Sequence, residues 1–66
     1  MKFIRLTQVM EMTGLARSTI YKLIAAEQFP ASVALGGKSV AWVLTEVEDW
    51  MLAKIAERDQ QSQNIG

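Results

Sequence analysis

The alternation of hydrophobic and polar residues predicts two short helices close together near the start of the chain. The first covers about residues 8–13, with Thr7 as its N-cap, because a threonine hydroxyl can accept a hydrogen bond from a free helical N–H group. Gly14 suits the left-handed conformation in which many helices end. Only residues 14–16 separate this pattern from the next one, which is the length of a helix-turn-helix corner.

The second helix is predicted over about residues 17–27. At 100° per residue, Ile20, Leu23 and Ile24 share one side and are expected to face the core. The rest of the surface of its first two turns carries polar side chains, which are Arg17, Ser18, Thr19, Tyr21 and Lys22. Pro30 ends the element, because the residue before a proline is pushed out of the α region.

A change of period after Ala31 predicts a β-hairpin. Its strands are expected near residues 32–35 and 40–44, since short β-branched runs flank the glycine-rich turn "GGKS" with Lys38 near its tip. An isolated hairpin is hardly stable in water. Trp42 is therefore expected to anchor this hairpin on the helices.

The stretch "TEVEDWMLAKIAERD" predicts the clearest helix of the chain. Thr45 and Glu48 have the spacing of a capping box, in which each side chain pairs with a backbone N–H near the other residue. The polar remainder, residues 59–66, has no period and is expected to be a disordered tail. The folded domain is accordingly predicted to be residues 1–58.

Length and composition restrict the function. The 66 residues make one small domain, and the absence of Cys and His excludes a disulfide framework, a His/Cys zinc site and histidine acid–base catalysis. The acidic residues Glu46, Glu48 and Asp49 stand at a helix start, where capping and the helix dipole account for them. We therefore expect no enzyme activity, no cofactor and no metal. The first residues lack the apolar run of a signal peptide or membrane span, so we expect a cytoplasmic, nucleoid-associated protein without membrane contact.

The net charge of zero hides an uneven distribution of charged residues. Residues 1–45 carry five basic and two acidic side chains, a balance of +3, whereas residues 46–66 carry two basic and five acidic ones, a balance of −3. Such a division can give one basic and one acidic face. The alternative is that the charges are scattered for solubility.

The elements in this order predict a mostly helical α+β domain, a winged helix-turn-helix with two short helices, a β-hairpin wing and a C-terminal helix. In that architecture the second helix enters the major groove of double-stranded DNA and the wing contacts the backbone. No acidic residue occurs from Thr13 to Ala26, and the helix begins with hydrogen-bond donors. In the wing, Lys38 and Ser39 are the candidate phosphate contacts. The simpler alternative for both segments is ordinary solvated surface.

A longer stretch carries a resemblance. From about Ile4 to Met51, and most distinctively in "TGLARSTIYKLI", "FP", "LGGKSVAW" and "TEVEDW", the chain resembles the AlpA family of prophage regulators. The resemblance implies a MerR-like winged helix-turn-helix related to phage excisionases, with DNA binding for transcriptional control or excision. It also implies DNA contacts by Arg17, Ser18, Thr19, Tyr21 and Lys22 in the second helix, and by Lys38 and Ser39 in the wing.

The chain departs from the family pattern at three positions. Ala16 stands where the family usually has a serine that caps the second helix, although Ser18 could cap a helix that begins later. Ala41 and Val43 stand where relatives often have arginines, and both are expected to be exposed and free to pack against a neighbouring protomer. We expect a homodimer or a cooperative array on DNA, with an integrase as a further partner. The alternative function is a protein-interaction module that docks on an integrase, a response regulator or RNA polymerase with little DNA binding.

Overall fold

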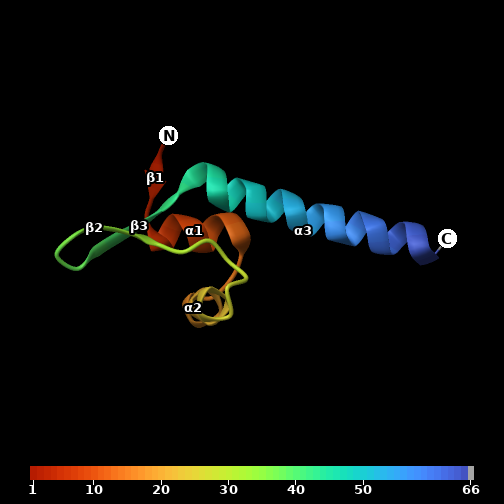
Figure 1. Cartoon of the computed structure of the whole chain (residues 1–66), viewed down its shortest axis with the longest axis horizontal. Helices are drawn as coiled ribbons and strands as arrows, with labels where there is room; N and C mark the ends of the chain where they lie inside the picture. Colours follow the sequence, from red (N-terminus) through yellow and green to blue (C-terminus); the bar gives the residue numbers. More distant parts are fainter. Residues whose placement is uncertain (66) are drawn as a thin grey trace.

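Three helices and a three-stranded sheet make up the protein in its computed structural model, which describes the backbone of residues 1–65 and the side chains of residues 1–60. In chain order the elements are β1 (Phe3–Ile4), α1 (Leu6–Thr13), α2 (Arg17–Ala25), β2 (Val33–Gly36), β3 (Ser39–Val43) and α3 (Leu44–Ile65). Figure 1 shows the β2–β3 hairpin and the far end of α3 extending from opposite ends of the molecule. The predicted fold class, a mostly helical α+β winged helix-turn-helix, is confirmed.

The sheet has the strand order β1-β3-β2, with antiparallel pairing on both sides of β3. The hairpin strands are within one residue of their predicted positions. The two-residue strand β1 was not predicted, because it is too short to show an alternating pattern. It pairs Phe3 with Val43 and Ile4 with Trp42. The sheet therefore fastens the N-terminus of the chain to the base of the wing.

The register of the wing shifts next to its turn. Ala34 lies opposite Val40, but Gly36 rather than Leu35 lies opposite Ser39. Leu35 is therefore the additional residue of a β-bulge. The turn beyond it requires glycine, because Gly36 and Gly37 have φ angles of 123° and 55° that other residues rarely adopt.

The core lies between the sheet and the helices. Its buried members are Ile4, Val9, Ile20, Phe29, Trp42 and Val47. Trp42 is completely covered, and its Nε1 donates a hydrogen bond to the carbonyl oxygen of Pro30 at 3.0 Å. The predicted role of Trp42 as the anchor of the hairpin is confirmed.

Ala41 corrects one of the predictions from the sequence. It was expected on the exposed face of the wing, yet it is 0% exposed. Because β3 is the central strand, both β1 and β2 flank it, and a methyl side chain is short enough to be covered by its neighbours. Val43, expected to be exposed as well, is half-buried opposite Phe3. Ala41 is therefore unavailable as a contact for a neighbouring protomer.

Helix α1 begins earlier than predicted. Its N-cap is Arg5, which makes no side-chain capping bond, and the first helical bond runs from the N–H of Val9 to the carbonyl oxygen of Arg5 at 3.1 Å. The prediction that Thr7 caps this helix is wrong, because pairing of β1 with β3 leads the chain directly into the helix after Ile4. Gly14 ends α1 in the left-handed conformation, with φ of 74°, as predicted.

Helix α3 differs from the prediction at both ends. It starts at Leu44, whose N–H donates to the carbonyl oxygen of Lys2 at 2.8 Å, so Thr45 lies inside the first turn and is not the N-cap. The backbone remains helical to Ile65, where residues 59–66 were expected to form a disordered tail. Neither glycine nor proline interrupts the sequence between Leu44 and Ile65, so nothing local stops the helix. Gly66 lies outside the described residues, and the domain boundary at residue 58 stays a prediction.

Candidate nucleic-acid interface

The corner between α1 and α2 is held by hydrogen bonds at the end of α1. The hydroxyl of Thr13 donates to the carbonyl oxygen of Val9 at 2.8 Å and accepts from the N–H of Leu15 at 3.2 Å. The N–H of Gly14 donates to the carbonyl oxygen of Met10 at 2.8 Å. The Gly14 bond satisfies a carbonyl group that the end of α1 leaves free, and the Thr13 hydroxyl links Val9 of α1 to Leu15 of the corner, which fixes the direction in which the chain leaves α1.

Helix α2 begins without a side-chain cap. Its N-cap is Ala16 in an extended conformation, with φ of −74° and ψ of 157°. The carbonyl oxygen of Ala16 accepts the first helical bond from Ile20, and Ser18 lies within the helix rather than at its start. Ser18 therefore does not replace the missing cap. Ile20 is fully buried and holds the helix on the core.

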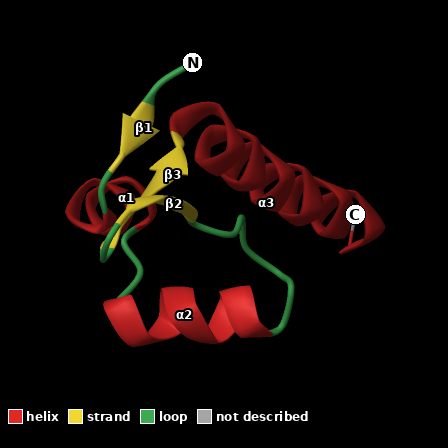
Figure 2. Cartoon of the chain, turned by 60° about the vertical axis from the view of Figure 1, so that its left-hand side comes forward, coloured by secondary structure: helices red, strands yellow, loops and turns green. Residues whose placement is uncertain are grey.

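The predicted contact residues of α2 divide into two groups. Arg17, Ser18, Tyr21 and Lys22 are exposed, whereas Thr19 is half-buried. Figure 2 shows α2 on one side of the molecule, away from β1 and the start of α3. The structure thus brings four of the five residues onto one open surface and places Thr19 at its edge.

Aromatic contacts connect this surface to the core. The ring of Tyr21 meets Trp42 edge to face, with centroids 6.3 Å apart, and the guanidinium carbon of Arg17 lies 5.9 Å from the Tyr21 centroid. Tyr21 is still 40% exposed. Buried Trp42 in β3 therefore supports Tyr21, and Tyr21 in turn positions the Arg17 side chain. A cation–π contact at an exposed site typically contributes about 0.5–1 kcal/mol.

The end of α2 has an unusual backbone. The helix was predicted to include Glu27, but it stops at Ala25, and Glu27 has φ of 58°. The N–H of Gln28 donates to the carbonyl oxygen of Leu23 at 2.8 Å, which is the six-to-one bond of a Schellman motif. Glycine usually occupies this left-handed position, so a glutamate here is strained.

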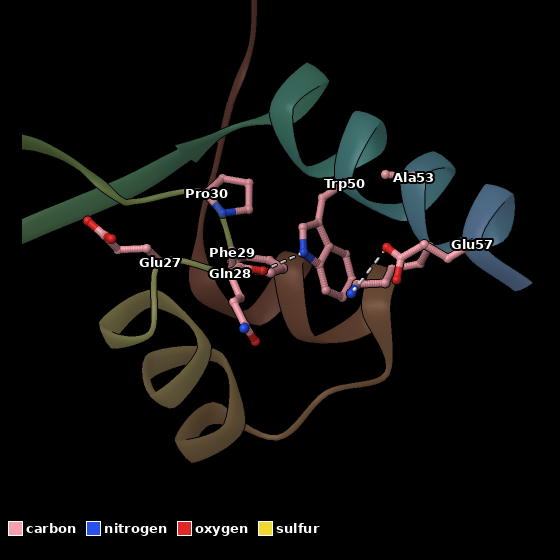
Figure 3. Close-up of a pocket in the computed structure, with 8 residues that line it drawn as sticks. Glu27, Gln28, Phe29, Pro30, Trp50, Ala53 and Glu57 are labelled. Atoms are coloured by element: carbon pink, nitrogen blue, oxygen red, sulfur yellow. Dashed lines mark hydrogen bonds and ion pairs between the residues drawn. The ribbon is translucent and has the colours of Figure 1, made fainter.

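A shallow groove of about 550 Å³ lies between the segment after α2 and helix α3 (Figure 3). The Nε1 of Trp50 donates to the carbonyl oxygen of Gln28 at 2.7 Å, and the Trp50 ring meets Phe29 with centroids 4.8 Å apart. The Nζ of Lys54 lies 5.5 Å from the Trp50 centroid and 3.5 Å from Glu57. The two Trp50 contacts tie the segment after α2 to α3 and so fix the far end of α2, whereas the Lys54 contacts lie within α3.

The wing residues Lys38 and Ser39 are both exposed. Within residues 1–60, no hydrogen bond or ion pair connects them to the five polar residues of α2. The structure therefore presents two separate polar sites on elements that share an anchor, since Trp42 of β3 packs against Tyr21 of α2.

The charges of these two sites are not neutralised inside the described part of the chain. The ion pairs among residues 1–60 are Lys54–Glu57 and Arg58–Asp59, both on α3. Neither pair includes Arg17, Lys22 or Lys38, so these three cations remain available to an anionic partner. Across the described residues, no group of three acidic side chains could hold a metal ion, and no helix has the length and apolar composition needed to cross a membrane.

Three features of this region could not be read from the sequence. The support of Tyr21 by Trp42 depends on a contact between distant elements. The strained Glu27 carries no sequence signal, because a glycine is the usual mark of a left-handed helix end. The bulge at Leu35 was hidden as well, since "SVALGGKSVAW" reads as an uninterrupted alternation into the turn.

Comparison with known proteins covers the strands, helices α1 and α2, and the first half of α3. Residues 2–55 match the family model described as "Prophage CP4-57 regulatory protein (AlpA)". The chain is 53% identical over 57 residues to uncharacterized protein ORF88 of Enterobacteria phage P4, covering 86% of this chain and 65% of that protein, which is just under two thirds of its length. It is 36% identical over 56 residues to the DNA-binding transcriptional activator AlpA of Escherichia coli strain K12, covering 76% of this chain and 80% of that protein. The chain belongs to the AlpA family of prophage regulatory proteins.

Proposed function

We propose that this protein is a sequence-specific DNA-binding regulator of a prophage or another mobile element. Helix α2 enters the major groove, where Arg17, Ser18, Tyr21 and Lys22 contact bases and phosphates and Thr19 contacts the groove edge. The wing contacts the backbone through Lys38 and Ser39. The observation that carries the proposal is the open face of α2, whose two cations lie outside the ion pairs found among residues 1–60.

The relatives support the biological setting of this proposal. One of them is a phage protein, and the other is named a DNA-binding transcriptional activator. We propose that this chain acts at promoters of its own element, or as an excisionase that bends DNA beside an integrase. Both activities use the same α2 surface. They differ in the partner of the DNA-bound protein, which for an excisionase is an integrase.

Selection of DNA from a random-sequence duplex pool tests the proposal. We expect the wild-type protein to enrich one sequence, and Arg17→Ala with Lys22→Ala to weaken binding to it by at least roughly tenfold, since a good base contact contributes about 1–3 kcal/mol. The slope of log K against log salt concentration should fall by about 0.9 for each phosphate that no longer has a cationic partner. Lys54→Ala with Arg58→Ala removes the same charge from α3 and should preserve sequence preference. Failure to enrich any sequence, or equal weakening in both double variants, would contradict the proposal.

Association between copies is part of the proposed function. One small DNA-binding module buries only about 600–1,000 Å² on DNA, which limits its specificity. On α3, Leu52 is 62% exposed and Ile55 is also exposed, and both line a hollow together with Thr45, Glu48, Asp49 and Met51. We propose that this surface contacts a second copy on DNA, as a homodimer or in an array, or an integrase. Leu52→Ser should abolish cooperative binding to duplexes with two sites while leaving binding to one site unchanged.

The competing function is a protein-interaction module with little DNA binding. The exposed leucine and isoleucine of α3, bordered by Glu48 and Asp49, are the observation that favours it. The two functions differ in the pool selection. A module of this kind would bind integrase, a response regulator or RNA polymerase in pull-down experiments without enriching a DNA sequence.

A further inference from the structure

An exposed leucine occupies the wing where the sequence indicated only polar contacts. Leu35 is 46% exposed and stands next to Gly36, the last residue of β2, which is followed by the turn at Gly37 and Lys38. It is the bulged residue of the hairpin, because Ala34 pairs with Val40 and Gly36 pairs with Ser39. A bulge turns a side chain out of the regular alternation of its strand. The bulge in the backbone of the wing therefore sets the direction of the Leu35 side chain.

Leu35 makes no contribution to the hydrophobic core. Val40, its near neighbour in the hairpin, packs against the buried cluster, whereas Leu35 is not among the residues that do. A single exposed leucine is common on protein surfaces. This one, however, shares the end of the wing with Lys38 and Ser39, so an apolar group and two phosphate-binding groups lie together on one small projection.

The shape of the wing suits a narrow groove. A β-carbon added to Gly36 or Gly37 would meet no atom within 4 Å, so the turn is slender and its backbone is open on the outside. The minor groove of B-DNA is about 6 Å wide, and its walls are formed by the C–H groups of deoxyribose. Apolar side chains, leucine among them, are used by proteins that bind this groove.

We propose that Leu35 is an apolar DNA contact, which packs against the deoxyribose wall of the minor groove beside the phosphate held by Lys38. The inference rests on the proposed DNA binding and adds to it a contact that is independent of both charge and base sequence. Because no counterion is released when an apolar side chain meets a sugar, this contact contributes affinity without contributing to the salt dependence.

Substitutions at Leu35 and Lys38 separate the two kinds of wing contact. The probe is the duplex enriched by the wild-type protein from a random pool, trimmed to a single site so that contacts between copies do not contribute. Leu35→Ser should weaken binding roughly tenfold with an unchanged salt slope, as expected when about half of a leucine side chain is no longer buried against DNA. Lys38→Ala should lower the slope by about 0.9. Leu35→Met, which keeps an apolar side chain, should bind nearly as the wild type does.

Ala34→Ser is the matched control, because it places a serine at the neighbouring exposed position of the same strand while keeping Leu35, and it should not change single-site binding. Circular dichroism and thermal unfolding verify that each variant is folded, and hydroxyl-radical footprinting locates the wing on the sugars. Equal affinities of wild type and Leu35→Ser on the enriched duplex would overturn the inference while leaving the proposed function intact. So would a weakening in Leu35→Met as large as in Leu35→Ser, because the shape of the bulge would then matter and the apolar contact would not. If no duplex is enriched, the proposed function fails first, and the inference fails with it.

Discussion

Ala16 occupies the N-cap of α2 but has no side-chain oxygen to accept a hydrogen bond from the free N–H groups of the first turn. Ser, Thr, Asp or Asn at an N-cap typically stabilises a helix by about 1 kcal/mol relative to Ala. Ala16→Ser should therefore raise the free energy of unfolding by about 1 kcal/mol, measured by urea titration of tryptophan fluorescence.

Ser18→Ala is the control for this prediction, because Ser18 lies inside the helix, is exposed and makes no capping bond. It should leave stability nearly unchanged. If Ser18→Ala costs as much as Ala16→Ser gains, then Ser18 is the functional cap and the helix begins later than the structure shows.

Glu27 stores backbone strain at the opposite end of the same helix. A non-glycine residue in the left-handed conformation costs roughly 1–2 kcal/mol, and glycine removes that cost while adding conformational freedom to the unfolded chain. With φ of 58° at this position, Glu27→Gly should stabilise the protein by about 0.5–1 kcal/mol. Glu27→Ala removes the same charge but keeps the strain, so its effect should be near zero. Equal effects of the two substitutions would assign the change to the charge of Glu27 and not to its backbone.

At the scale of elements, two indole N–H groups hold the segment after α2 against the rest of the fold. Trp42 donates to Pro30 at 3.0 Å from the buried core, and Trp50 donates to Gln28 at 2.7 Å on the exposed side of the groove. Replacing either by Phe removes the donor and keeps an aromatic ring. The two substitutions should differ in cost, because a carbonyl left without a partner is more costly at the part-buried Pro30 than at the exposed Gln28.

Trp50→Phe should lower the free energy of unfolding by about 1 kcal/mol. Trp42→Phe should lower it by about 2–4 kcal/mol, because the smaller phenyl ring also leaves a cavity in the core. Denaturant titrations monitored by circular dichroism give both values. Trp42→Phe should in addition weaken DNA binding, since Tyr21 packs on the Trp42 ring and Arg17 lies over Tyr21. Equal costs for the two variants would contradict the assigned difference in burial.

The elements also show what could be predicted from the sequence. Gly14, the start of α2 at Arg17 and the two hairpin strands were all predictable, because local residue preferences determine them. Contacts between elements distant in the sequence determine the features that the sequence did not predict. Strand β1 and the burial of Ala41 both depend on which strands lie beside β3, and the early start of α3 depends on the bond from Leu44 to Lys2. The polar face of α2 was visible in the sequence, whereas the Trp42 support beneath it was not.

At the scale of the whole molecule, the two ends differ in shape and in charge. The chain extends over 51 × 24 × 19 Å, with the wing and the far part of α3 at opposite ends (Figure 1). The excess of basic residues lies in residues 1–45, which include α2 and the wing, and the excess of acidic ones lies in residues 46–66. Phosphate attracts the first part and repels the second, so the charge distribution favours one orientation on DNA over the reverse.

The far part of α3 should be dispensable for folding. Within the described side chains, every residue from Leu52 to Gln60 is exposed, and the last α3 residues that pack on the core are Trp50 and Met51. A chain that ends at residue 58 keeps the whole core, so its free energy of unfolding should stay within about 0.5 kcal/mol of the value for residues 1–66. Its affinity for a single-site duplex should be unchanged. A chain that ends at residue 49 lacks Trp50 and Met51 and should fail to fold. These chains can be compared by circular dichroism and by fluorescence anisotropy with labelled DNA.

A large decrease in stability in the chain ending at 58 would place the domain boundary beyond that residue. Loss of cooperative binding alone, with single-site binding retained, would instead assign residues 59–66 to contacts between copies.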